Sequence, residues 1–119
     1  MSKNVNTWIG EGYIATDLTL RHTTDSSRPV TNFVLVMELV YKSKKNQEED
    51  SFIIKKRIEK IPMTAWSTVA EKICNEFKKN DRVRVNGSLR TKQIEDKKGL
   101  LHTSLEIIVN DLELLNRKD

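Results

Sequence analysis

The sequence predicts an all-β domain with one helix, closed as a five-stranded barrel. Apolar and polar residues alternate along five segments, as they do in strands, and one further segment repeats its apolar residues at helical spacing. These segments follow one another as three strands, a helix and two strands, so the helix falls between the third and fourth strands. The 119 residues are enough for one domain with a small core.

The first two strand segments differ in what interrupts them. Residues 5–14 contain Gly10 and Gly12, and glycine inside a strand often marks a bulge or a close backbone approach. The polar stretch 21–29 then predicts a turn. Residues 30–41 are largely apolar on both alternating faces. We therefore expect this strand to be central, or to be covered on both sides by the fold or by a partner.

The remaining strands are separated by polar connections. Three further segments follow the strand pattern: 51–61, 82–94 and 100–115. The first comes after a very polar loop at 42–50 and is expected to end at Pro62, because proline cannot donate to a strand ladder. The last two are joined at 95–99, where Gly99 can adopt the positive φ of a hairpin connection.

The helical segment is 68–79, and its apolar side chains form one stripe: Val69, Ala70, Ile73, Cys74 and Phe77. Thr68 and Glu71 have the spacing of a capping box. The two lysines at 78–79 lie at the expected negative end of the helix dipole, and Asn80 can take the left-handed cap.

This order of elements is that of the OB fold, a five-stranded barrel with its helix between the third and fourth strands. We expect residues 1–115 to form that domain and residues 116–119 to be a short C-terminal end without an acidic tail. The sequence shows no signal-peptide pattern and no apolar run long enough to cross a membrane, so we expect a cytoplasmic protein. Cys74 is the single cysteine and allows no internal disulfide.

Positive charge is concentrated on one face of residues 82–94. The net charge is only +4, but seven alternate positions of this strand carry four cations and no acid: Arg82, Arg84, Arg90 and Lys92. Lys55 and Lys56 add charge in the preceding strand. Single-stranded nucleic acid is bound by a basic groove flanked by exposed rings. We predict that these six side chains contact phosphates, and the alternative is a solvated sheet face.

Two aromatic residues are candidate platforms for base stacking. Tyr41 ends a strand beside the lysine-rich loop, and Trp66 lies just before the helix. Each could instead be structural, and Trp66 in particular could anchor the start of the helix in the core. Trp8, in the first strand, is expected to lie in the core. No catalytic motif, cofactor motif or metal-ligand cluster is present, so we expect a protein that is not an enzyme and has no cofactor or metal.

Three stretches have the order and spacing of a known family: VNTWIGEGYIATDLTLR (5–21), VTNFVLVM (30–37) and VAEKICNEFKKNDRVRVNGSLRTK (69–92). They resemble the bacterial-type single-stranded DNA-binding proteins over most of the chain. The matching positions are Val5, Asn6, Gly12, Asp17, Arg21, Asn32, Gly87, Leu89 and Arg90.

The resemblance implies an OB-fold protein that coats single-stranded DNA in replication, recombination or repair. It implies base stacking by Tyr41 and Trp66, with Ile94 as a flat apolar contact where the family usually has an aromatic residue. A fourth platform, near Lys60, is replaced. It also implies a homo-oligomer, a dimer or a tetramer, that contacts replication or recombination proteins and no membrane.

Two other functions remain open. The chain also resembles the short primosomal replication protein B group, whose members assist helicase loading, so it could be an adaptor that docks to a helicase. An RNA-binding OB protein is the second alternative, because the sequence shows no feature that reads a 2′-hydroxyl.

Overall fold

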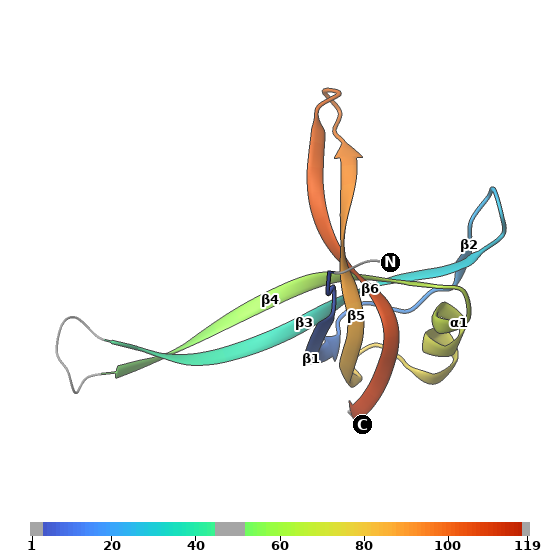
Figure 1. The fold of residues 1–119 in the computed structure, drawn as a ribbon. Helices are drawn as coiled ribbons and strands as arrows, with labels where there is room; N and C mark the ends of the chain where they lie inside the picture. Colours follow the sequence, from blue (N-terminus) through green and yellow to red (C-terminus); the bar gives the residue numbers. More distant parts are fainter. Residues whose placement is uncertain (1–3, 45–51, 118–119) are drawn as a thin grey trace.

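The structure, a computed structural model, describes residues 4–44 and 52–117. Within these ranges the strands are β1 (Trp8–Ile14), β2 (Arg21–His22), β3 (Pro29–Lys44), β4 (Phe52–Trp66), β5 (Arg82–Glu95) and β6 (Leu101–Asn116). One helix, α1 (Ser67–Glu76), lies between β4 and β5 (Figure 1). The polar loop expected at 42–50 falls mainly outside the described residues.

The five long strands of the described chain close into a barrel. Neighbours follow the order β1-β5-β6-β4-β3, and β1 also pairs with β3 at Tyr13–Val36 and Ile14–Leu35, which completes the circle. The β4–β6 pairing is parallel and the others are antiparallel. The predicted all-β barrel, with its helix between the third and fourth long strands, is confirmed.

The core lies inside this barrel and under α1. Strand residues of one parity point inward, and α1 adds Ala70 and Ile73. The largest fully buried apolar side chains are Ile14, Leu35, Met63, Ile73, Val83, Val85 and Ile107. Gly12 lies where β1 crosses β3, and a Cβ there would collide with the carbonyl oxygen of Val36. The close backbone approach expected at this glycine is therefore present, and it permits barrel closure.

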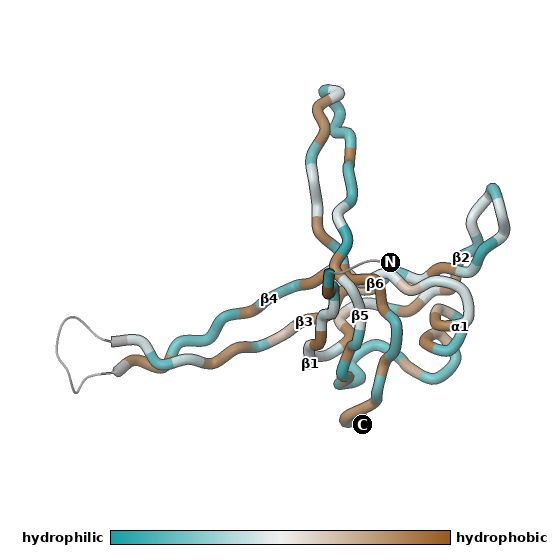
Figure 2. Tube along the Cα trace, in the orientation of Figure 1, coloured by the Kyte–Doolittle hydropathy of each residue, from teal (hydrophilic) through white to brown (hydrophobic). Residues whose placement is uncertain are grey.

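Two hairpins extend out of the barrel (Figure 1). We call residues 38–44 with 52–58 the long arm and residues 88–105 the short arm. The radius of gyration is 17.9 Å, whereas a compact domain of this length has about 13.5 Å. Hydrophobic positions recur along both arms (Figure 2). The expected covering of residues 30–41 holds for the first half, but Val40 is 68% exposed in the arm.

The prediction that the third long strand ends at Pro62 is wrong. β4 continues to Trp66, and Pro62 pairs with Val34 within the β3–β4 ladder. On its other side β4 pairs with β6 at Met63 and Thr64 in the described structure. Pro62 thus lies just before that ladder begins, at a position where proline is tolerated because no second partner needs its N–H.

The predicted helix boundaries are also wrong. Because β4 runs directly into the helix, α1 begins at Ser67, with Trp66 in the N-cap position and no side-chain capping bond. The Thr68–Glu71 capping box is therefore absent. At the other end Phe77 is extended, so the lysines at 78–79 lie beyond the helix. Asn80 does have a positive φ of 78°, but in the turn that leads into β5.

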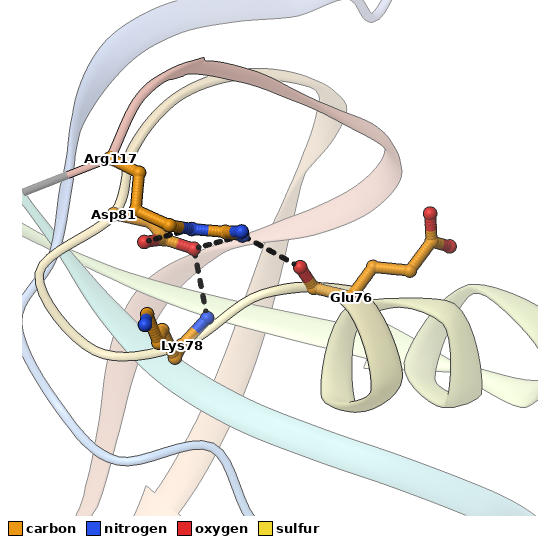
Figure 3. Close-up of polar contacts among 4 residues, drawn as sticks. All are labelled: Glu76, Lys78, Asp81 and Arg117. Atoms are coloured by element: carbon orange, nitrogen blue, oxygen red, sulfur yellow. Dashed lines mark hydrogen bonds and ion pairs between the residues drawn. The ribbon is translucent and has the colours of Figure 1, made fainter.

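Arg117, which follows β6, completes the end of α1 (Figure 3). Its Nη2 donates to the Glu76 carbonyl at 3.0 Å and to Asp81 Oδ2 at 3.1 Å, and its Nε donates to Asp81 Oδ1 at 3.2 Å. The Lys78 backbone N–H donates to Asp81 Oδ2 at 3.0 Å. Asp81 is 1% exposed. One carboxylate thus links the end of α1, the start of β5 and the end of β6.

The charge of Asp81 should stabilise the fold. Burial raises the pKa of Asp81, but its hydrogen bonds with Arg117 and the Lys78 N–H outweigh burial, so the pKa lies below the usual aspartate value. This contribution is full above the unfolded-state pKa of about 3.9 and is lost as pH falls through the folded-state value. We expect Asp81→Asn to lower the free energy of unfolding by about 1–3 kcal/mol at neutral pH.

Denaturant unfolding at neutral and acidic pH measures this effect. The difference between the two proteins should shrink as pH falls below about 4, because the unfolded chain then takes up a proton at Asp81 while the folded chain resists it, and should disappear once the folded carboxylate is protonated as well. Asp111→Asn is the control: Asp111 is exposed and contacts Lys72 at 3.3 Å, so little change is expected. If Asp81→Asn lowers the free energy of unfolding by the same amount at acidic pH as at neutral pH, the charge of Asp81 does not have the proposed role.

Candidate nucleic-acid interface

A groove crosses the outer surface where the base of the short arm lies beside β3 and β4. It consists of two adjoining hollows of about 370 and 420 Å³. Four side chains line both hollows: Asn32, Thr64, Lys92 and Glu106. The first hollow also includes Arg21, Trp66 and Arg90, and the second includes Pro62 and Ile94.

Strand alternation and register bring these residues together. Thr64 and Trp66 are two positions apart on β4, so they share a face, and Asn32 of β3 lies opposite Thr64. Arg90 and Lys92 likewise share a face of β5, and Arg90 lies opposite Glu106 of β6. Because β4 also pairs with β6 in this region, the two faces form one surface.

Trp66 lies at one end of the groove and is only half-buried. The guanidinium of Arg28 lies 4.6 Å from the centre of its ring, and Arg28 Nε donates to Ser67 Oγ at 3.0 Å. This contact is a cation–π interaction. The indole N–H is buried and has no acceptor within the described chain. Trp66 is thus the N-cap residue of α1 and also lines the groove, but it is not among the side chains that pack against the core.

A chain of hydrogen bonds crosses the floor of the groove. Arg21 Nη2 donates to Asn32 Oδ1. Asn32 Nδ2 donates to Thr64 Oγ1 at 2.8 Å, and Thr64 Oγ1 donates to Glu106 Oε2 at 2.7 Å. The four residues come from β2, β3, β4 and β6. Sequence reasoning did not identify Thr64, Glu106 or Arg28 as site residues, since only the strand register brings them to the groove.

The predicted row of cations on β5 is divided between two places. Arg90 and Lys92 line the groove, are exposed, and form no ion pair with any described residue. Arg84 lies six residues, about 20 Å, from Arg90. Its Nε donates to Glu11 at 2.7 Å, and it lies 3.8 Å from Glu113. The hydrogen bond with Glu11 raises the pKa of the Arg84 guanidinium.

Arg82 lines a different hollow, of about 590 Å³, together with Tyr13 and Glu38. The division arises because the first half of β5 lies between β1 and β6, whereas the second half leaves the barrel with β6 alone. The neighbouring strands supply acids to the first half, and the pattern of one strand cannot reveal them.

The other predicted site residues lie on the long arm. Tyr41 is 46% exposed and pairs directly with Lys55, so the ring and the ammonium share a face. Lys56 is on the opposite face and pairs with Glu38 at 3.3 Å. Tyr41 is seven residues, about 23 Å, from Val34 at the groove. Trp8 packs against the core, as expected.

Residues 4–44 and 52–117 contain no cluster of three or more His, Cys, Asp or Glu side chains arranged to hold a metal ion. The described helix is too short to cross a membrane.

Sequence relatives of this chain are single-stranded DNA-binding proteins. One from Caldanaerobacter subterraneus subsp. tengcongensis is 31% identical over 107 residues, which are 90% of this chain and 65% of that protein. Single-stranded DNA-binding protein 1 of Streptococcus pyogenes serotype M18 is 24% identical over 115 residues, covering 97% of this chain and 82% of that protein. This chain therefore spans slightly less than two thirds of the first relative.

A solved structure shares the fold. The Plasmodium falciparum SSB in complex with single-stranded DNA superposes with a TM-score of 0.82 at 18% sequence identity, covering 98% of this chain and 99% of that one. At this identity the likeness confirms the OB fold. The profile of the single-strand binding protein family matches residues 5–115, nearly the whole chain. The chain therefore belongs to the single-strand binding protein family.

Proposed function

We propose that this protein binds single-stranded DNA in the groove, and that it protects the strand without catalysing a reaction. The observation that carries the proposal is the placement of Arg90 and Lys92, neither of which has an ion pair in the described chain, along one groove with Trp66 and Ile94. Stacking platforms combined with unneutralised cations are what single-strand binding requires. Membership in a family named for single-strand binding supports the same function.

Each group has a separate role in this proposal. Trp66 stacks against a base, and Ile94 provides a flat apolar contact for a neighbouring base. Arg90 and Lys92 hold phosphates. Tyr41 and Lys55 repeat the same combination of ring and cation on the long arm, so a strand leaving the groove along β3 reaches a second contact.

The remaining predicted cations contribute less. Glu11 and Glu113 surround Arg84, and Glu38 pairs with Lys56. A cation that already has a carboxylate partner releases fewer counterions when a phosphate arrives. Arg82 lies in the hollow beside Tyr13, away from the groove, and would contact the DNA only if the strand wraps around the barrel.

Removing the ring of Trp66 tests the stacking role. One stacked base contributes about 1–3 kcal/mol, so we expect Trp66→Ala to weaken oligo(dT) binding by about 5- to 150-fold. Fluorescence anisotropy of a labelled oligonucleotide measures this, and thermal unfolding checks that the variant is folded. Trp66→Phe, which keeps a ring, should retain most of the affinity. A folded Trp66→Ala protein with normal affinity would refute the stacking assignment.

The salt dependence of binding tests which cations meet phosphates. For single strands the slope of log K against log salt is about −0.7 per neutralised phosphate. We expect Arg90→Gln and Lys92→Gln each to make the slope shallower by about 0.7. Arg84→Gln is the matched control on the same strand, and its slope should stay near that of the wild type. An equal loss of slope in Arg84→Gln would overturn the division of β5 into two regions.

We also propose that the chain forms homo-oligomers, dimers or tetramers. The support is the apolar surface of the arms, on which Val40, Ile54 and Leu101 are each at least 65% exposed. Exposed apolar surface of this extent usually marks an interaction site. Sedimentation velocity at several concentrations should show a species larger than the monomer. A monomer at every concentration would exclude self-association.

Two further measurements separate this function from the alternatives. Competition between oligo(dT) and oligo(U) of equal length distinguishes a DNA-binding from an RNA-binding OB protein. Weak binding to both, combined with a stable complex with a replication helicase, would instead indicate an adaptor of the primosomal type.

A further inference from the structure

Two carboxylates, Asp17 and Glu106, line the groove, which is unexpected in a site for a polyanion. Glu106 lines both hollows and lies directly opposite Arg90, yet no ion pair joins these two residues in the described structure. A negative charge here repels phosphates. Its position therefore suggests that it meets the other part of the nucleotide, the base.

The hydrogen-bond chain on the groove floor fixes the direction in which Glu106 can interact. Thr64 is 4% exposed and receives a hydrogen bond from Asn32 Nδ2, so its own proton goes to Glu106 Oε2. Arg21 holds the Asn32 amide in the orientation that this requires. Glu106 Oε1 has no hydrogen-bond partner in the described chain. An ionised carboxylate only accepts hydrogen bonds, so this oxygen is open to a donor.

A base stacked on Trp66 lies close to this carboxylate. Trp66 and Thr64 are two positions apart on the same face of β4, a separation of about 6.6 Å. Thr64 is hydrogen-bonded to Glu106 at 2.7 Å. One edge of a base on the indole can thus point toward Glu106.

The chemistry of that edge distinguishes the pyrimidines. Cytosine carries an amino group at C4, which donates, and carboxylates accept from this group. Thymine carries a carbonyl oxygen at C4, which cannot donate and would face the carboxylate with like partial charge. The N3–H of thymine is a donor, but it lies beside O4, so pointing it at the carboxylate also brings O4 against the same negative charge. A site built to hydrogen-bond one group disfavours the analogue that lacks it, because its own polar atom is left unpaired.

We propose that Glu106, held by Thr64, makes the groove prefer a base with an amino group at C4 over thymine. This inference rests on the proposed function, since it requires a base stacked on Trp66. Glu106 is thus a specificity-determining residue, whereas Arg90 and Lys92 hold phosphates regardless of sequence.

Oligonucleotides of 5-methylcytosine and of thymine provide the test. 5-Methylcytosine carries the methyl group of thymine and the amino group of cytosine, so comparing oligo(5-methyl-dC) with oligo(dT) of equal length isolates the pyrimidine's hydrogen-bonding edge. Binding is measured above neutral pH, where cytosine N3 is unprotonated. We expect the wild type to bind oligo(5-methyl-dC) about fivefold tighter or more.

Variants show whether Glu106 causes the preference. In Glu106→Gln the ratio of the two dissociation constants should fall toward one, because an amide can donate as well as accept. Removing a charge also strengthens phosphate binding, but equally for both oligonucleotides, so the ratio is unaffected by that term. Thr64→Val, which removes the hydroxyl and keeps the shape, should lower the ratio in the same direction and serves if Glu106→Gln does not fold.

Arg90→Gln is the control for a phosphate contact. It should weaken binding to both oligonucleotides and leave their ratio unchanged. Equal binding of the two oligonucleotides by the wild type, tighter binding of oligo(dT), or an unaltered ratio in folded Glu106→Gln would each overturn this inference while the proposed function stands. Failure to bind either oligonucleotide would overturn the proposed function, and this inference with it.

Discussion

The difference in length between β1 and β5 is the constraint on which the architecture depends. β1 has seven residues and closes the barrel against β3 at Tyr13 and Ile14, where Gly12 allows the backbones to meet. β5 has fourteen residues, so beyond the Trp8–Gly87 pair only β6 remains beside it. The second half of β5 therefore leaves the barrel as an arm. The base of that arm forms one side of the groove.

The same mismatch in strand length produces the long arm and its exposed edges. β3 and β4 pair up to Lys44 and Phe52, well beyond the barrel. A strand edge without a partner exposes backbone donors and acceptors that attract other chains, and proteins limit this with charged side chains. Lysines occur along this arm beside apolar side chains, and such charges oppose pairing with another chain. In the proposed binding mode, lysines of the same arm contact phosphates. The features that protect the arm and those that could bind a polyanion are thus the same residues.

Local features of the fold could be predicted from the sequence, and long-range ones could not. Alternation predicted the strands, and the apolar stripe predicted α1, because both depend on near neighbours. The Thr68–Glu71 capping box and the stop at Pro62 were wrong because β4 continues directly into the helix. Alternation along β5 predicts one row of cations, but Glu11 of β1 pairs with Arg84, and that contact depends on strand register. The floor of the groove depends on register in the same way.

In the proposed binding mode the groove offers few aromatic platforms, and this changes what determines binding. Ile94 is aliphatic, so it offers a base apolar contact without the stacking of two π-systems. Stacking tolerates any base, since every base has a flat face. Where stacking is reduced, charge and hydrogen bonding account for a larger share of the affinity. Charge–phosphate contacts likewise carry no information about the base sequence. Hydrogen bonds to base edges do carry it, so the hydrogen-bond chain that ends at Glu106 is the part of the groove that can distinguish bases.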